Sequence, residues 1–184
     1  MHLTVEQRGS KGKISVRVRR APFVVCDEQS GALQAGADSG AHDLALAAAL
    51  EGILEQTVLL EAIPQLLFEL SIEIVGSSVA DLPCAAIAAN TALIHAGLQC
   101  MDVVAGTTVA LCGDGSVLFD PRQEELAAAK ALCTVCACSG TGAVVYVLQR
   151  GAVDAVAALE LVEAAAAACV ALRETICAQL QKVT

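Results

Sequence analysis

The chain has 184 residues, is 56% hydrophobic with only 2% aromatic residues, and carries a formal net charge of −9. This length suits one domain, and the composition predicts a core of aliphatic side chains and alanines. No run of about 18 residues lacks a polar interruption, which argues against a membrane span, and no basic-then-apolar leader opens the chain, which argues against secretion. The nine cysteines are therefore expected to be reduced thiols that fill small core sites.

Residues 13–19 alternate between apolar and polar side chains, which predicts a strand with one buried face. The inward set is Ile14, Val16 and Val18, and the outward set is Ser15, Arg17 and Arg19. Pro22 ends this strand because proline cannot donate a ladder hydrogen bond. Residues 26–40 are rich in Gly, Ser, Asp and Gln without periodicity and predict a flexible loop, and residues 41–60 predict a helix.

Residues 65–97 are predicted to form the centre of the domain. Residues 65–75 alternate as a second half-buried strand, a short loop follows, and residues 83–97 predict a helix. Pro83 suits the first turn of that helix, Gly97 can close it, and Ser78 or Asp81 can cap its start. The helix is apolar almost all round and is therefore expected to be buried, which makes a layered α/β domain.

The second half predicts two hairpins and a long helix. Residues 102–112 and 116–119 flank a Gly-Asp-Gly turn, and a short acidic helical turn follows at Asp120. Residues 131–138 and 143–149 predict the second hairpin, and residues 153–181 predict the terminal helix. The whole of 1–184 is expected to be a single domain.

The charges are unevenly placed, because six of the 11 basic residues but only one of the 20 acidic residues lie within the first 20 positions. Arg17 and Arg19 share the outward face of the first strand, and Arg20 follows at its end. The three guanidinium groups would lie within about 10 Å of each other, given roughly 3.3 Å of rise per residue. Such a cluster suits RNA phosphates. An exposed strand edge that discourages aggregation and an acidic protein neighbour remain alternative interpretations.

Metal sites and catalytic motifs are weakly indicated. Cys133, Cys136 and Cys138 are spaced like metal ligands, but residues three apart on a strand point to opposite faces, so core thiols are expected. His95 lies near a helix C-terminus, where it suits the helix dipole. Asp120 at a strand end could hold Mg²⁺, although an Asp before a proline is also typical of a helix cap.

Several short motifs, taken in order, resemble the RNase PH family, in particular the inert ring subunits of the eukaryotic RNA exosome. They are Arg19-Arg20-Ala21-Pro22-Phe23, Leu44-Ala45-Leu46-Ala47 through Leu54-Glu55, Leu60 to Pro64, His95-Ala96-Gly97, Met101-Asp102-Val103-Val104-Ala105-Gly106, and Leu118-Phe119-Asp120-Pro121 with Glu124-Glu125. The resemblance implies an RNase PH-type mixed sheet with packed helices (ribosomal protein S5 domain 2-like). It also implies that the chain is N-terminally shortened relative to the family.

The same resemblance implies that the chain is not an enzyme. Active members carry an Arg in the loop before the buried helix and two Asp six residues apart. Here Leu82 stands at the Arg position, and Leu126 stands at the second Asp position after Asp120. An aliphatic side chain can neither bind phosphate nor coordinate Mg²⁺. No catalytic residue, metal or cofactor is therefore expected.

The implied function is a structural position in the exosome core ring, which helps to thread RNA to a separate nuclease. The implied partners are other RNase PH-like ring subunits, RNA-binding cap subunits, an associated exoribonuclease and single-stranded RNA, with no membrane. The implied locations are the nucleus, nucleolus and cytoplasm. Two alternatives remain: a phosphorolytic 3'-5' exoribonuclease that contributes part of a shared active site, and a free-standing RNA-binding or assembly module.

Overall fold

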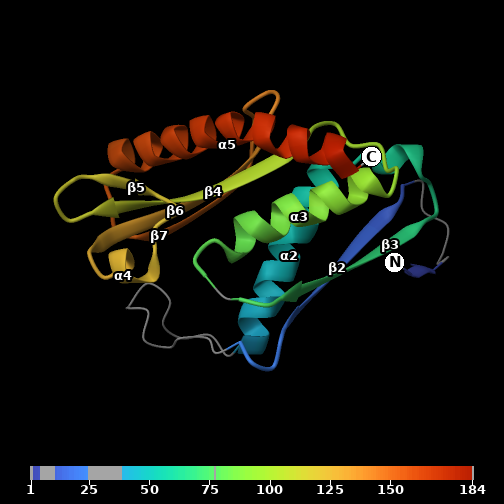
Figure 1. Ribbon diagram of the computed structural model, residues 1–184, viewed down its shortest axis with the longest axis horizontal. Helices are drawn as coiled ribbons and strands as arrows, with labels where there is room; N and C mark the ends of the chain where they lie inside the picture. The colour runs from blue at the N-terminus through green and yellow to red at the C-terminus, as the bar shows by residue number, and fades with distance from the viewer. Residues whose placement is uncertain (1, 5–10, 25–38, 77, 184) are drawn as a thin grey trace.

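The computed structural model describes residues 2–4, 11–24, 39–76 and 78–183, and these residues form two sheets with packed helices (Figure 1). The elements are β1 His2–Thr4, β2 Lys13–Arg20, α2 Ser39–Thr57, the 3-10 turn η1 Leu60–Ala62, β3 Leu67–Ile74, α3 Asp81–His95, β4 Val104–Cys112, β5 Val117–Phe119, α4 Gln123–Leu126, β6 Ala129–Cys138, β7 Val144–Gly151 and α5 Ala155–Val183. The predicted mixed α/β architecture is confirmed. The predicted loop at 26–40 lies outside the described residues, except that residues 39 and 40 begin α2.

The first sheet has the order β1-β3-β2 and is mixed, as predicted. β2 and β3 run parallel, with Lys13 opposite Leu67 and Arg20 opposite Ile74, whereas β1 pairs antiparallel with β3. The alternation in β2 is as expected, because Ile14, Val16 and Val18 are buried and the residues between them are exposed.

The second sheet has the order β5-β4-β6-β7 and is antiparallel throughout. Both predicted hairpins are present, as β4–β5 and β6–β7. β4 and β6 are central strands and are buried almost along their whole length, which explains why their sequences lack a strict alternation of polar residues.

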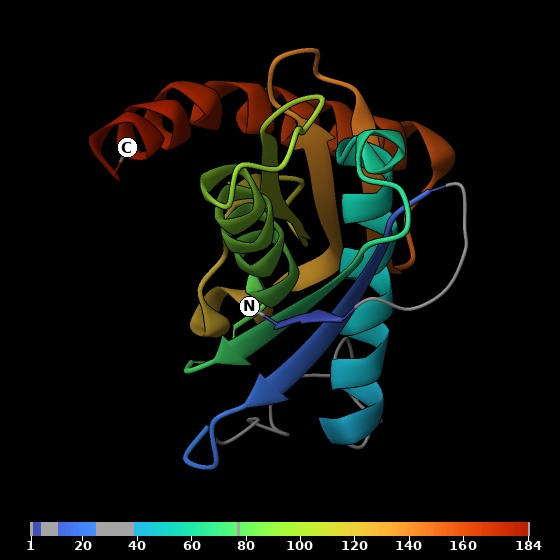
Figure 2. The ribbon, with the colours of Figure 1, turned by 90° about the vertical axis from the view of Figure 1, so that its right-hand side faces the viewer.

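The two sheets and the long helices form successive layers (Figures 1 and 2). α2 and α3 lie between the two sheets, and α5 covers the opposite face of the second sheet over β4 and β6. The fully buried side chains of the central layer include Leu50, Ile53, Leu54, Leu93 and Val104. Under α5 a second cluster joins Leu161 and Ala165 to Val109, Cys133 and Val135.

The helix α3 is buried on one side only, which corrects the expectation that it is buried all round. Ala86, Ala89 and Leu93 face the core, whereas Ala88 and Ala92 are exposed. The neighbouring layers therefore cover the side of α3 that carries Ala86, Ala89 and Leu93, and they leave the side with Ala88 and Ala92 exposed. Gly97 closes the helix with a φ of +83°, as predicted, because glycine tolerates the left-handed region.

The helix α5 packs on the sheet with Leu161, Ala165 and Cys169, and its outer side is exposed. By length and composition alone, Ala155–Lys182 could cross a membrane, with a mean hydropathy of 2.0 in its most apolar window. The few polar interruptions in this segment therefore do not exclude a span, contrary to the expectation from the sequence. Length and hydropathy alone do not distinguish a membrane span from a helix that packs on a sheet. In this structure α5 packs on the second sheet.

Candidate functional site

The predicted site lies on β2, at the outer face of the first sheet. Arg17 and Arg19 are exposed there and Lys13 joins them on the same parity. In the described part of the chain neither arginine forms an ion pair. The cross-strand neighbours on β3 moderate this positive charge, because Arg19 lies opposite Glu73 and Ser15 lies opposite Glu69.

Arg20 does not belong to this cluster, and the predicted grouping of three arginines is wrong in this respect. The alternation of the strand puts Arg20 on the same side as Val18, toward the interior. Its side chain is only 8% exposed. Arg17 and Arg19 are therefore brought together, and Arg20 is held on the opposite face.

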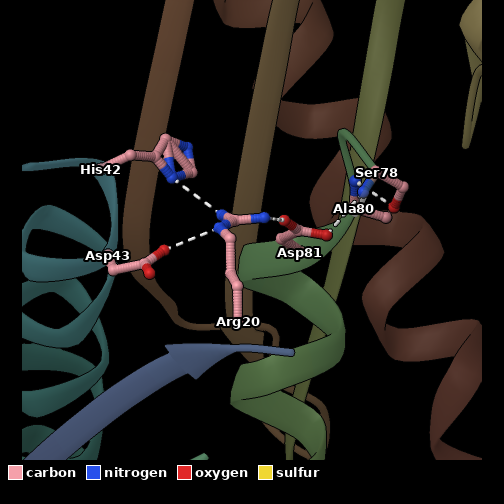
Figure 3. Close-up of polar contacts among 6 residues, drawn as sticks. All are labelled: Arg20, His42, Asp43, Ser78, Ala80 and Asp81. Carbon is pink, nitrogen blue, oxygen red and sulfur yellow. Dashed lines mark hydrogen bonds and ion pairs between the residues drawn. The ribbon is translucent and has the colours of Figure 1, made fainter. Parts of the chain in front are cut away.

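Arg20 lies at the centre of a polar cluster formed with the N-terminal ends of α2 and α3 (Figure 3). Its Nε donates to Asp43 Oδ1 at 2.7 Å, and its Nη1 donates to Asp81 Oδ2 at 3.0 Å. Its Nη2 lies 3.0 Å from His42 Nδ1, which must accept, because arginine has no acceptor atom. Burial disfavours the charge of Arg20, yet the hydrogen bonds that it donates to Asp43 and Asp81, together with their negative charges, outweigh burial and raise the pKa of Arg20. The cluster joins β2 to both helices.

The loop before α3 is organised by Asp81 and Ser78, although neither caps the helix as predicted. Asp81 Oδ1 accepts from the Ser78 N–H at 2.7 Å, and Ser78 Oγ accepts from the Ala80 N–H at 3.1 Å. The N-cap residue is Ala80, without a side-chain hydrogen bond. Leu82 follows and is only 7% exposed, packed in the central core. His95 is exposed in the last turn of α3, the place predicted for it.

Asp120 is exposed and has a φ of +51°, with its N–H donating to the Thr108 carbonyl at 2.8 Å. It does not cap α4, because Arg122 is the N-cap and donates its N–H to Glu125 Oε2 at 2.8 Å. The helix-cap interpretation of Asp120 is therefore wrong. The pKa of the Cys84 thiol is raised mainly by burial, and the negative charges of Asp120 and Asp81 raise it further. Asp120 therefore lies close in space to the start of α3.

The cysteines of β6 are core thiols, as the strand geometry predicted. Cys133 packs under α5, whereas Cys136 packs in the central layer on the other face of the strand. Burial, with a smaller effect of Cys169, raises the pKa of Cys136 to about 12. Among the described residues no group of three or more His, Cys, Asp or Glu side chains is placed to hold a metal ion.

The partners of Arg20, namely His42, Asp43 and Asp81, were not predicted from the sequence. One signal was available, because Arg20 continues the inward parity of Ile14, Val16 and Val18. An inward arginine requires buried carboxylates, since a buried charge is costly unless it is paired. The sequence could not say which of the 20 acidic residues would supply them.

Comparison with known proteins finds exosome components by sequence. "Exosome complex component Rrp41" of Pyrobaculum arsenaticum is 31% identical over 119 residues, which cover 65% of this chain and 45% of that protein. The Rrp41 of Pyrobaculum calidifontis is 30% identical with the same coverage. The chain thus spans about half the length of these relatives. No family model matches the chain.

Comparison of the fold finds the same group of proteins. Rice (Oryza sativa) Rrp46 superposes with a TM-score of 0.76 at 17% identity, covering 96% of this chain and 77% of Rrp46. The Archaeoglobus fulgidus exosome with RNA bound to its active site contains a chain that superposes with a TM-score of 0.68 at 17% identity, covering 90% of this chain and 71% of that one. The chain therefore has the RNase PH-type fold of exosome subunits, as the sequence predicted.

Proposed function

We propose that this chain is a structural, non-catalytic subunit of an exosome-type ring, which supports 3'-5' RNA processing and degradation by a separate nuclease. The observation that carries the proposal is the agreement of two comparisons, since both the sequence and the fold match exosome components. The motif order in the sequence favours the ring position of the subunit called mRNA transport regulator.

The start of α3 supports the non-catalytic part of the proposal. Leu82 is buried in the core and offers no charge to a phosphate. The guanidinium of Arg20 contacts Asp81 at the start of α3, but it is paired with both Asp43 and Asp81. A phosphate would have to compete for it with two largely buried carboxylates, which is unfavourable.

The test is phosphate-dependent shortening of single-stranded RNA by the purified chain in the presence of Mg²⁺. We expect no release of nucleoside diphosphates, because the phosphate-binding cation and the second carboxylate are replaced by leucines. Release that disappears in Asp120→Ala would overturn the non-catalytic proposal.

The alternative, a partial active site completed by a neighbouring chain, rests on Asp120. It is an exposed carboxylate close to the start of α3. The same assay on a reconstituted ring, with wild type compared to Asp120→Ala, tests this alternative. Equal rates would exclude a role for Asp120, and a large loss would favour the shared site.

Arg17 and Arg19, with Lys13, form the surface we propose for RNA phosphates. Binding should be independent of sequence, because phosphate contacts carry no base information. In the assembled ring, the double variant Arg17→Ala with Arg19→Ala should weaken RNA binding at low salt. The slope of log affinity against log salt should flatten by roughly 0.7 for each phosphate that the ring no longer binds.

Lys11→Ala is the matched control for this experiment, because it removes one exposed positive charge that Glu61 already pairs at 2.7 Å. An unchanged affinity and salt slope in the double variant would show that the surface is not an RNA site. Failure of the ring to assemble would place Arg17 and Arg19 in a subunit interface instead.

The proposed partners are other RNase PH-like ring subunits, cap subunits and an exoribonuclease, and the proposed locations are the nucleus, nucleolus and cytoplasm. Purification of the chain from its own cells, with partners identified by mass, tests both the ring and the alternative of a free-standing module. A set of exosome subunits would support the ring, and purification without them would contradict it.

A further inference from the structure

The outer face of the first sheet carries a basic row that is only one strand wide. Lys13, Arg17 and Arg19 are exposed along β2, while α2 and α3 lie on the other face of the sheet (Figure 2). The row is about 20 Å long at roughly 3.3 Å of rise per residue, and the neighbouring strand is about 4.8 Å away. A single phosphate backbone that follows β2 can therefore meet all three cations.

Carboxylates lie on the β3 side of this row. Glu69 and Glu73 are exposed on β3, where they lie opposite Ser15 and Arg19 in the register of the two strands. None of the ion pairs found among the described residues uses either carboxylate. Their negative charges therefore act on any anion that lies over β3.

A third carboxylate lies on the opposite side of the row, at the free edge of β2. Glu51 of α2 accepts a hydrogen bond from the N–H of Val16, with its Oε1 at 2.7 Å. No strand of the described residues pairs with this edge. The basic row is therefore bounded by negative charge on both sides.

The outward side chains of β2 and β3 include no aromatic ring on which bases could stack. The choice between RNAs is therefore left to the arrangement of charges. A duplex has two phosphate backbones, and when one follows β2 the other lies over β3 or beyond the free edge of β2. Either position brings the second backbone close to carboxylates, which repel it.

We propose that Glu69 and Glu73, with Glu51 at the free edge, are specificity-determining residues that restrict this surface to one phosphate backbone. This inference rests on the RNA surface of the proposed function and adds the groups that decide which RNA it accepts. The cations attract any RNA, whereas the carboxylates repel the second backbone of a duplex. Because a duplex has the higher charge density, a basic surface without these carboxylates would favour it.

The test is the affinity of the assembled ring at low salt for a single-stranded RNA and for a blunt RNA duplex of the same length. The measured quantity is the ratio of the two affinities, compared between wild type and the double variant Glu69→Gln with Glu73→Gln. Glutamine keeps the shape of the side chain and removes its charge. In this variant the duplex should gain roughly two- to tenfold over the single strand, because two exposed repulsive charges are lost.

Glu160→Gln with Glu163→Gln is the matched control, since both residues are exposed on α5 and the net charge changes by the same amount. The ratio of affinities in this control should equal that of wild type. An equal change in the two double variants would show an effect of net charge alone and would overturn the inference. An unchanged ratio in the variant of Glu69 and Glu73 would overturn it as well.

The variant Arg17→Ala with Arg19→Ala separates this inference from the proposed RNA surface. If it weakens RNA binding while the ratio stays unchanged in the variant of Glu69 and Glu73, the RNA surface stands and the role of the carboxylates is overturned. If it leaves RNA binding unchanged, both are overturned.

Protection of Lys13 from an amine-reactive reagent gives a second measurement, on the wild-type ring, that does not depend on how the variants fold. Single-stranded RNA should slow the modification of Lys13 at least twofold more than duplex RNA at the same nucleotide concentration. Lys130, which is exposed on β6 in the second sheet, is the internal control and should react at a constant rate. Equal protection of Lys13 by the two RNAs, or protection by neither, would overturn the inference.

Discussion

Arg20 is a charged residue in the interior, and its partners decide what it does. Its guanidinium joins the end of β2 to Asp43 of α2 and Asp81 of α3, with side chains 8%, 17% and 8% exposed in that order. A buried charge without a partner is far more costly than an exposed one. The cluster therefore holds three elements in place rather than offering a cation to a ligand.

Arg20→Ala should lower the free energy of unfolding by roughly 3–5 kcal/mol, because two largely buried carboxylates lose their counter-ion. Arg17→Ala, which removes an exposed guanidinium from the same strand, should change it by about 0.5 kcal/mol or less. Urea denaturation of both variants measures the difference. Equal effects of the two substitutions would contradict the assigned role of Arg20.

The buried thiol of Cys136 should make the free energy of unfolding fall at alkaline pH. Burial raises its pKa in the folded state from the ordinary value of 9.0 to about 12. The unfolded chain therefore releases this proton first, so the stabilisation is complete below pH 9 and is lost as the pH rises toward 12. The cost is about 1.4 kcal/mol per pH unit in that window.

Cys136→Ala removes this thiol. Between pH 8 and pH 10, the free energy of unfolding of wild type should therefore fall by about 1 kcal/mol more than that of the variant. Urea unfolding in the presence of a reductant measures both. A wild type and variant that decline in parallel would show that the thiol is not protected from ionisation in the fold.

At the scale of elements, the close approach of α3 to β4 depends on Gly106. A Cβ at this position would lie 2.8 Å from Pro83 Cβ and 3.0 Å from Cys136 Sγ. Neither neighbour can move freely, because Pro83 lies in the first turn of α3 and Cys136 is on a central strand. This close approach fixes the distance between the helix layer and the second sheet.

Gly106→Ala should therefore destabilise the fold by roughly 1–3 kcal/mol through overpacking. Gly52→Ala is the opposite case, since no atom outside its own helix lies within 4 Å of the added Cβ in α2. It should stabilise by about 0.5–1 kcal/mol, because alanine loses less backbone entropy than glycine. Thermal unfolding of the pair measures both, and a shift of the same sign in each would contradict the close approach.

At the scale of the whole molecule, several surfaces remain uncovered. The outer side of α5 exposes Val156 at 65% and Leu159 at 59%, and Met101 is 62% exposed. The outer face of the first sheet is polar and charged instead. Exposed apolar surface on this scale is typical of chains that bind partners, and stable ring interfaces bury on the order of 2,000 Å² or more.

Expressed alone, the chain should therefore self-associate or precipitate, whereas co-expression with exosome ring subunits should increase the soluble yield and give one complex. Size-exclusion chromatography of the two preparations measures this. A monomer that stays soluble at high concentration and on heating would contradict the need for partners.

The sequence alone determined the order of the strands and helices from β2 onward and the faces of its amphipathic strands, because periodicity and turn residues are local properties. It predicted neither the short strand β1 nor the turn η1. The alternation of β2 and β3, both hairpins and the divergence of Cys133 from Cys136 all followed from it. Tertiary structure decided which residues met. The pairing of Arg20 with Asp43 and Asp81 joins residues 23 and 61 positions away, and no local pattern specifies such a choice. The exposed side of α3 was likewise decided by the layers around it, since burial depends on what the rest of the chain places on each face.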